Sequence, residues 1–252
     1  MGKILAITNQ KGGVGKSTTA INLSDCLAAK GEKILVIDMD PQGNTTSGLG
    51  IEKSSVETSV YDLLMGEADP KETVMKTAFE NLYLIPATED LAGAEIELLD
   101  ADEREMRLKN GLSKLKKKYD RVIIDCPPSL SILTINSLTA ADSVLIPIQC
   151  EYYALEGLSQ MLNTTDLIRE RLNPKLKIEG VVFTMFDART NLSQEVVQNV
   201  KDNLDIKVFK TIIPRNVRLA EAPSYGLPVN RYDRSSTGAV AYRRLASEFR
   251  KG

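Results

Sequence analysis

A glycine-rich stretch near the start of the chain limits the possible folds more than any other sequence feature. Residues 4–7 are apolar and predict a short buried strand, residues 10–19 contain the glycines, and residues 20–23 begin a helical pattern. A strand, a glycine-rich turn and a helix in this order form a loop that holds phosphate groups. The backbone N–H groups of such a loop and the helix N-terminus favour an anion.

The individual loop residues suit a nucleoside triphosphate with magnesium. Gly12, Gly13 and Gly15 let the backbone N–H groups point inward because no Cβ obstructs them. Lys16 adds a positive charge for the β- and γ-phosphates, and the Ser17 hydroxyl is the expected protein ligand of Mg²⁺. The simpler alternative is a glycine-rich turn without a ligand. We predict instead a loop that binds a nucleoside triphosphate with Mg²⁺, because so specific a run between a strand and a helix is very improbable by chance.

The loop departs from the usual phosphate-binding pattern. That pattern places a glycine five positions before Gly15, where this chain has Gln10, followed directly by Lys11. The sequence Lys-Gly-Gly-Val-Gly-Lys-Ser resembles the deviant P-loop ATPases: the ParA/Soj partition proteins, the MinD cell-division proteins and the nitrogenase iron proteins. The loop residues that the resemblance implies as nucleotide contacts are Lys11, Gly12, Gly13, Val14, Gly15, Lys16, Ser17 and Thr18.

The resemblance implies that Lys11 acts on a second copy of the chain. Lys11 precedes the phosphate loop, so we do not expect it to fold back onto its own nucleotide. In the resembling family this lysine reaches across a dimer to the partner's nucleotide, where a cation stabilises charge that develops on the γ-phosphate. Lys11 and Lys16 are therefore candidate catalytic residues. The alternative for Lys11 is a solvated surface lysine.

Carboxylates follow two of the predicted strands. Asp38 and Asp40 come at the end of the apolar run 33–37, and Asp125 follows the run 121–124. A carboxylate just past the carboxyl end of a strand lies on the ligand edge of a doubly wound sheet. We expect Asp125 to hold Mg²⁺ through water. The resemblance implies that Asp40 positions the attacking water as a catalytic residue, whereas Asp38 is left between a supporting role and a place in a polar turn.

The resemblance also assigns residues near the C-terminus. It implies that Pro214 packs on the adenine ring and that Asn216 hydrogen-bonds it, where the alternative is an ordinary proline turn. It implies that Arg189 and Arg218 bind double-stranded DNA without sequence preference, where the alternative is ordinary surface charge. Because the formal net charge is −2, DNA contact requires a local basic patch rather than a basic protein.

Composition excludes several kinds of site. The chain has no histidine, which excludes Ser-His-Asp and Cys-His catalysis and histidine-liganded metals. Cys26, Cys126 and Cys150 form no CxxC pair and are interpreted as reduced core residues. We do not expect the iron–sulfur cluster of a nitrogenase iron protein, because Cys126 and Cys150 lie in or beside strand-like runs rather than in loops.

The main rival is a MinD-like membrane-associated positioning ATPase. Residues 239–250 predict a C-terminal helix, but its large apolar residues are too few for a membrane-surface helix, so we interpret it as a packing helix. No apolar run approaches the roughly 20 residues of a membrane span. The chain enters a strand at once, so we expect no signal peptide. We expect no stable membrane association.

Hydrophobic patterning predicts alternating strands and helices. The expected strands are residues 4–7, 33–38, 81–86, 121–125, 143–148, 178–184 and 207–213. The expected helices are residues 17–30, 60–65, 91–118, 132–141, 158–172, a helix capped by Ser193, and 239–250, with a loop at 45–50.

The expected fold is a single doubly wound α/β domain over residues 1–252, with a mostly parallel sheet flanked by helices. The resemblance to ParA/Soj proteins extends along nearly the whole chain, including residues 91–98. It implies a cytoplasmic, nucleoid-associated ATPase that drives chromosome or plasmid partitioning. Its expected partners are a second copy in an ATP-dependent homodimer, non-specific double-stranded DNA, and a ParB/Spo0J-type centromere-binding protein that stimulates slow hydrolysis.

Overall fold

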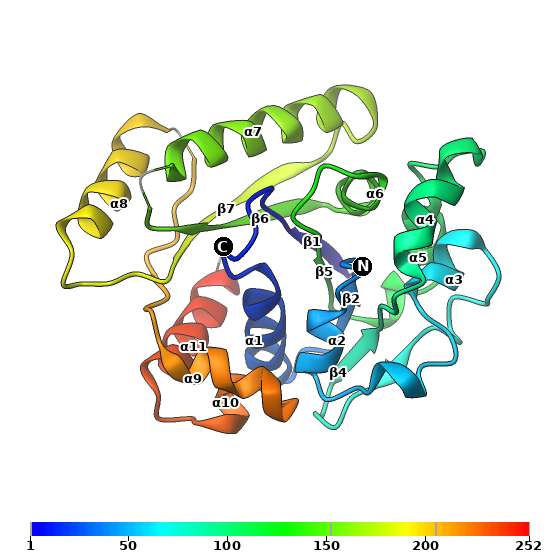
Figure 1. Cartoon of the computed structure of the whole chain (residues 1–252), viewed down its shortest axis with the longest axis horizontal. Coiled ribbons are helices and arrows are strands. Elements are labelled where there is room, and N and C mark those ends of the chain that lie inside the picture. The colour runs from blue at the N-terminus through cyan, green and yellow to red at the C-terminus, as the bar shows by residue number, and fades with distance from the viewer. Residues whose placement is uncertain (1, 152, 205, 252) are drawn as a thin grey trace.

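The computed structural model describes residues 2–151, 153–204 and 206–251. Within them the strands form one seven-stranded sheet in the order β3-β4-β2-β5-β1-β6-β7 (Figure 1). Neighbouring strands are parallel except β3 and β4, which are antiparallel. The strands are β1 Lys3–Ile7, β2 Ile34–Asp38, β3 Met75–Lys76, β4 Leu82–Ile85, β5 Arg121–Asp125, β6 Ser143–Gln149 and β7 Lys177–Thr184.

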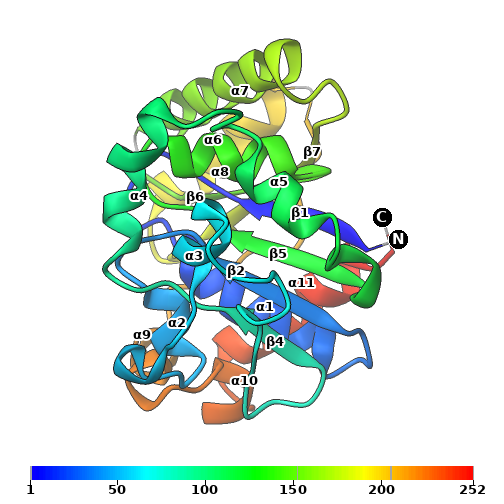
Figure 2. The same cartoon turned by 90° about the vertical axis from the view of Figure 1, so that its right-hand side faces the viewer.

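Helices cover both faces of the sheet (Figures 1 and 2). The α-helices are α1 Lys16–Ala28, α2 Asn44–Gly48, α3 Val60–Met65, α4 Leu91–Glu97, α5 Arg107–Leu112, α6 Ile132–Ala140, α7 Ala154–Arg171, α8 Asn191–Asn203, α9 Val217–Glu221, α10 Val229–Tyr232 and α11 Thr237–Phe249. Short 3₁₀ helices are η1 Lys53–Ser55, η2 Leu98–Asp100, η3 Lys116–Lys118 and η4 Ala222–Tyr225.

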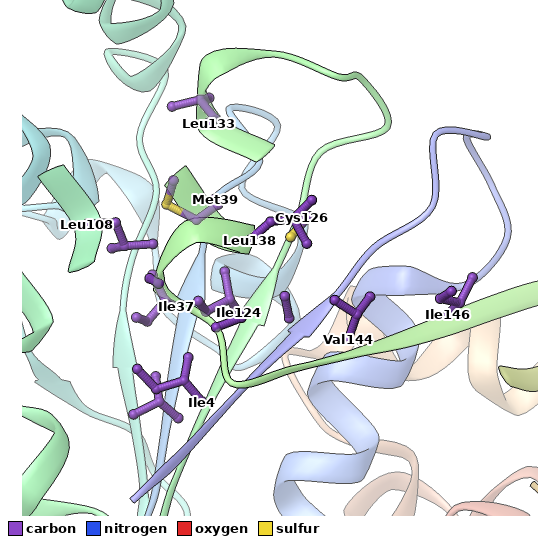
Figure 3. Packing of buried hydrophobic residues seen from close by; sticks show 14 of the residues in the cluster. Ile4, Ile37, Met39, Leu108, Ile124, Cys126, Leu133, Leu138, Val144 and Ile146 are labelled. Atoms are coloured by element: carbon purple, nitrogen blue, oxygen red, sulfur yellow. The ribbon is translucent and has the colours of Figure 1, made fainter. Parts of the chain in front are cut away.

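Two hydrophobic cores lie on opposite faces of the sheet because successive side chains of a strand point in opposite directions. In β1, Ile4 and Ala6 belong to the first core, and Leu5 and Ile7 belong to the second core. Both faces are therefore apolar, as expected for a parallel sheet covered by helices. The predicted fold class is confirmed. Figure 3 shows strand and helix side chains that meet in the first core: Ile4, Ile37, Ile124, Leu108, Leu133 and Leu138.

The C-terminal helix α11 packs on the sheet beside α1, as predicted for residues 239–250 (Figure 1). Its large apolar side chains, Leu245 and Phe249, are buried in the second core. Tyr242 is also buried, and its hydroxyl lies 3.1 Å from the Thr19 hydroxyl of α1. The apolar face of this helix is therefore used in folding.

The continuous helix predicted for residues 91–118 is wrong. The chain forms α4, η2 and α5, with a break between Asp100 and Arg107. Side chains satisfy the backbone at the break: the Arg104 guanidinium donates to the Leu99 carbonyl at 2.7 Å. The Asn136 amide of α6 donates to the Arg104 carbonyl at 2.7 Å and accepts from the Leu108 N–H at 3.1 Å. The break therefore depends on a residue distant in sequence.

The loop predicted for residues 45–50 is also wrong, because residues 44–48 form α2. Neither threonine of this helix is a strong helix former, but both side chains have buried partners. The Thr45 hydroxyl donates to Asp125 at 2.7 Å, and the Thr46 N–H and hydroxyl donate to Asp38 at 2.7 and 2.8 Å. Tertiary hydrogen bonds therefore override the local preference.

The strand predicted for residues 207–213 is reduced to an isolated bridge between Val208 and Val181 of β7, and a second bridge joins Pro214 to Phe186, just after β7. Between these two bridges, around Lys210 and Thr211, the segment does not pair regularly with the sheet. There the Glu248 carboxylate of α11 accepts the backbone N–H groups of Lys210 and Thr211 at 2.7 and 2.9 Å. Those donors are consequently not available to a regular ladder.

The N-terminal cap of α8 differs from the prediction. The helix begins at Asn191, and Thr190 is the cap, so the assignment of this role to Ser193 is wrong. The Thr190 hydroxyl accepts from the Ser193 N–H at 3.4 Å, which is the usual cap geometry three residues into a helix.

Candidate nucleotide-binding site

The phosphate loop lies at the carboxyl ends of the central strands. It connects β1 to α1, and β1 pairs with β5 so that Ile7 lies opposite Asp125. On the other side of β5, Asp125 lies opposite Asp38 of β2. Parallel pairing therefore brings the loop and both acidic motifs to one edge of the sheet, as the sequence predicted.

The loop conformation requires its glycines. Gly13 and Gly15 have φ angles of +74° and +87°, which L-residues with a Cβ rarely adopt. Lys16 folds back over the loop, and its ammonium group donates to the Lys11 carbonyl at 3.0 Å. The Lys16 side chain is buried, and this burial lowers the pKa of its ammonium group. The Val14 carbonyl is held by the Thr184 hydroxyl of β7 at 2.8 Å.

Two adjoining hollows open beside the loop. The first, of about 600 Å³, has the more polar lining, and its walls include Gly13, Lys16, Ser17 and Asp40. The second, of about 360 Å³, is more apolar. Both share loop and C-terminal residues, so they form one continuous site; the shared residues are Gly15, Thr18, Met185, Leu219 and Ala220. The site suits a ligand with an anionic end and a flat, less polar end.

Asp125 has the chemistry expected of a residue that holds a metal through water. Its Oδ2 accepts the Thr45 hydroxyl, whereas its Oδ1 is buried and forms no hydrogen bond of regular geometry among the described residues. Burial raises the pKa of Asp125 to about 7. The Ser17 hydroxyl lies close enough to the carboxyl to oppose the rise of its pKa. A buried carboxylate oxygen without a partner is costly unless a donor reaches it. Water bound to Mg²⁺ would supply that donor, so Asp125 and the Ser17 hydroxyl fit the ion.

Asp38 organises the turn that carries Asp40. The Asp38 carboxylate is fully buried and accepts three hydrogen bonds: from the Asp40 N–H at 3.2 Å, and from the Thr46 N–H and hydroxyl. Asp40 lines the first hollow, where its Oδ1 accepts the Gln42 N–H at 3.0 Å. Of the two roles that the sequence left open for Asp38, these contacts favour support of Asp40.

The adenine residues predicted by resemblance lie in the wall of the less polar hollow. Pro214 and Asn216 both line it, beside Thr184 and Ile213. The Asn216 side-chain amide donates to the Thr237 hydroxyl at 2.9 Å, and its Oδ1 is buried without a partner among the described residues. Their location agrees with the expected role, and the contacts with a base stay a prediction.

A sequence model of a family described as an AAA domain matches residues 2–178. The chain is 61% identical over 248 residues to the sporulation initiation inhibitor protein Soj of Bacillus subtilis, covering 98% of both chains. It is 51% identical over 251 residues to the chromosome partitioning protein ParA of Myxococcus xanthus, covering 100% of this chain and 89% of that one. The chain belongs to the ParA/Soj family of chromosome-partitioning ATPases. The predicted family is confirmed.

A solved relative of this ParA/Soj chain contains a nucleotide. The structure titled cobyrinic acid a,c-diamide synthase from Mycobacterium smegmatis, with bound ADP and magnesium, is 40% identical. It covers 98% of this chain and 93% of its own, with a TM-score of 0.87. This ParA/Soj member therefore shares its fold with a solved protein that contains ADP and magnesium.

Lys11, the lysine before the phosphate loop of this ParA/Soj chain, lines neither hollow. Its ammonium group forms an ion pair with Glu151, which follows β6. The Lys11 side chain is 45% exposed. The structure therefore leaves Lys11 at the surface beside the site, and its action on a second copy stays a prediction.

The predicted DNA-binding arginines lie on the surface, outside both hollows. The Arg189 side chain is 86% exposed and pairs with Asp187, which lowers the pKa of the Asp187 carboxyl. Arg218 pairs with Glu221 at 2.8 Å and with Asp233 at 3.4 Å. Each predicted DNA contact is therefore paired within the chain with a partly buried carboxylate.

Sequence reasoning missed several residues of the site. Thr45 bonds Asp125, Glu151 pairs with Lys11, and Met185 lines both hollows with a φ of +50°. Strain of this kind concentrates at functional sites. No local pattern marks Thr45 or Met185, whereas the Lys11–Glu151 pair was hidden by a separation of 140 residues.

The three cysteines are buried, and burial raises the pKa of each thiol to about 12. Among the described residues no group of three or more Cys, Asp or Glu side chains is arranged to hold a metal ion directly. Nor does any helix there have the length and apolarity needed to span a membrane.

Proposed function

We propose that this chain is an ATP-dependent DNA-segregation switch. It binds ATP with Mg²⁺, forms a homodimer around two nucleotides, and grips double-stranded DNA without sequence preference in that state. Slow hydrolysis then returns it to monomers. The observation that carries this proposal is the continuous site of two hollows around a deviant phosphate loop, in a chain of the ParA/Soj family.

Candidate binding residues can be named for the phosphates, the base and the magnesium ion. The loop N–H groups and Lys16 surround the phosphates, and the less polar hollow accepts the base between Pro214 and Asn216. Solved relatives bind ADP or an ATP analogue, each with magnesium. Bound Mg²⁺ would neutralise charge on the phosphates, held by the Ser17 hydroxyl and through water by Asp125. Asp40 then orients the attacking water.

Lys11 supports the dimer step of the proposal. It lies outside its own nucleotide hollows, and its exposed ion pair with Glu151 is of the kind that contributes little and can exchange partners. In the dimer, Lys11 of each copy would reach the other copy's γ-phosphate. A cation arriving only on dimerisation couples hydrolysis to assembly, as an arginine finger does.

DNA binding would use Arg189 and Arg218. Each is exposed, and each exchanges its present carboxylate partner for a phosphate at little cost because surface ion pairs are weak. A dimer presents two copies of each arginine to one duplex, and linked contacts raise the affinity. A ParB/Spo0J-type protein would accelerate hydrolysis, and the active form would be found on the nucleoid.

Two other functions are less well supported. The 40%-identical relative carries the name of a cobyrinic acid a,c-diamide synthase, whereas relatives at 51% and 61% identity carry partition names. A MinD-like membrane role would need an apolar C-terminal face, but Leu245 and Phe249 of α11 are buried.

The proposal is tested by ATP turnover and sedimentation. We expect Mg²⁺-dependent ATP hydrolysis and a shift from monomer to dimer with ATP but not with ADP. Lys11→Ala should lose the dimer. A Lys11→Ala protein that dimerises normally would exclude the role of Lys11 in the partner's site. Co-sedimentation with anionic liposomes rather than with DNA would favour the membrane alternative.

A further inference from the structure

The helix α4 and the following turn η2 carry apolar side chains on two opposite sides. Leu91, Ala94 and Leu98 form the inner stripe and are fully buried in the first core. Ala92, Ile96 and Leu99, at spacings of four and three residues, form an outer stripe that is exposed, with Ile96 72% and Leu99 56% accessible. A surface helix of a globular domain ordinarily has one apolar stripe and one polar face.

The outer stripe lies in a segment, residues 89–105, in which acidic residues greatly outnumber basic ones. Residues 89–105 contain eight Asp or Glu residues and one base, Arg104, in a chain whose overall net charge is −2. That single base is already used, because Arg104 pairs with Glu105 and donates to the Leu99 carbonyl. The local excess of negative charge is therefore not neutralised within the segment.

A cleft with the same charge adjoins this surface. It has a volume of about 690 Å³ and lies between α3 and α5, which are neighbours of α4 on one side of the molecule (Figures 1 and 2). Its walls carry four carboxylates and two cationic side chains: Glu67, Asp69, Asp102, Glu103, Arg107 and Lys114. Asp102 and Glu103 belong both to the cleft and to the acidic segment, so the two features are continuous. We call them together the acidic surface.

We propose that the acidic surface docks a basic peptide segment with large apolar side chains, supplied by the ATPase-stimulating partner; this rests on the partner proposed above. Ile96 and Leu99 contact the apolar side chains, and the surrounding carboxylates pair with lysine or arginine. A few buried anchor residues supply most of the affinity of an interface, and complementary charge supplies specificity and a fast association rate.

Charge decides among the possible occupants. DNA and anionic lipid surfaces are both repelled by a segment with seven net negative charges, from eight acids and one base. Two copies of the chain that joined symmetrically through this surface would place acid against acid. A basic, apolar protein segment satisfies both properties of the surface.

The test uses the ParB-type protein of the same organism as the probe and two double variants. Ile96→Ser with Leu99→Ser removes the apolar anchors, and Glu95→Lys with Asp100→Lys reverses the charge beside them. We expect each double variant to bind the partner at least about tenfold more weakly, as when interface anchors are truncated, and to lose stimulation of ATP hydrolysis. Basal hydrolysis, ATP-dependent dimerisation and DNA binding should be unchanged, because these residues lie outside the nucleotide site.

Matched controls keep the result specific. Leu167→Ser changes an exposed leucine on α7, and Glu80→Lys reverses an exposed acid between β3 and β4; both should respond to the partner like the unmodified protein. Normal stimulation of both double variants would overturn the proposal. Loss of ATP-dependent dimerisation would show instead that the stripe joins two copies of the chain. If the unmodified protein neither binds the partner nor is stimulated, the proposed partner itself is wrong.

Discussion

The charged groups of two regions differ in burial and in their partners. We call the region around Asp38, Asp125 and Lys16 the nucleotide edge, and the region around Arg189 and Arg218 the arginine surface. At the nucleotide edge Asp38 and Asp125 are fully buried and Lys16 is nearly so, and their hydrogen bonds are to fixed backbone or threonine groups. At the surface Arg189 and Arg218 are exposed and pair with carboxylates of their own neighbourhood.

The difference indicates what each region can do. Burying a charge is costly, so the buried groups are held in one arrangement by several partners and are prepared for a ligand before it arrives. Exposed ion pairs contribute little and exchange readily, so the arginines are able to leave their carboxylates for another anion. One region is therefore suited to fixed recognition and the other to reversible contact.

The largest expected effect is at the buried lysine. Lys16→Ala should weaken ATP binding by about 100-fold, because removing a charged hydrogen bond costs up to ~3 kcal/mol. Lys11→Ala is the matched change outside the hollows, and the affinity of the monomer for ATP should stay nearly constant. Titration with a fluorescent ATP analogue measures both. If both variants lost ATP affinity equally, the buried Lys16 and the exposed Lys11 would not differ in their contribution to nucleotide binding, contrary to this prediction.

Asp38→Asn should lower the stability of the folded chain by about 2 kcal/mol, because an amide in place of the carboxylate leaves one or more of its buried donors unsatisfied. Urea denaturation measures the change. Asp40→Asn is the comparison, since the Asp40 side chain accepts one hydrogen bond in the structure against three for Asp38. A larger loss for Asp40→Asn would contradict the organising role of Asp38.

Reversing the exposed arginines should affect DNA but not nucleotide. Arg189→Glu and Arg218→Glu should each weaken binding of duplex DNA about tenfold. The slope of log affinity against log salt should become shallower by about 0.9 for each DNA phosphate that the variant no longer neutralises. Arg171→Glu on α7 is the control of equal charge change. Loss of ATP binding together with DNA binding would indicate misfolding rather than a direct role in gripping DNA.

The smallest effect is expected for the carboxylate that holds Arg189. Asp187→Asn removes the bidentate pair with Arg189 and should lower the melting temperature only slightly, because exposed pairs contribute at most about 1 kcal/mol. DNA affinity should rise slightly, since Arg189 no longer has to leave a carboxylate. A clear loss of thermal stability would show that this pair is structural.

The sequence predicted which edge of the sheet has the acidic residues of the candidate site, because these residues lie at strand ends. Asp38 and Asp125 follow apolar runs that could only be buried parallel strands, and pairing of those strands places them side by side. Gly13 and Gly15 adopt the positive φ angles that the phosphate loop requires. Local pattern was sufficient here because the sheet supplies the long-range geometry.

Apart from the cap of α8, the errors fall where a distant side chain decides the local structure. The helix break near Arg104 depends on Asn136, α2 depends on Asp38 and Asp125, and the edge segment departs from β7 because Glu248 takes two of its N–H groups. Periodicity carries no information about such partners. For the same reason the Lys11–Glu151 pair was not predicted.

The central claim is that ATP joins two copies of the chain and that only the joined pair grips DNA. Equilibrium binding to one duplex, measured with ATP and Mg²⁺, with ADP and Mg²⁺, and without nucleotide, tests it most directly. We expect tight, salt-sensitive binding of the duplex with ATP and Mg²⁺, and weak binding with ADP and Mg²⁺ or without nucleotide. Equal affinity in all three conditions, with the protein monomeric throughout, would contradict it.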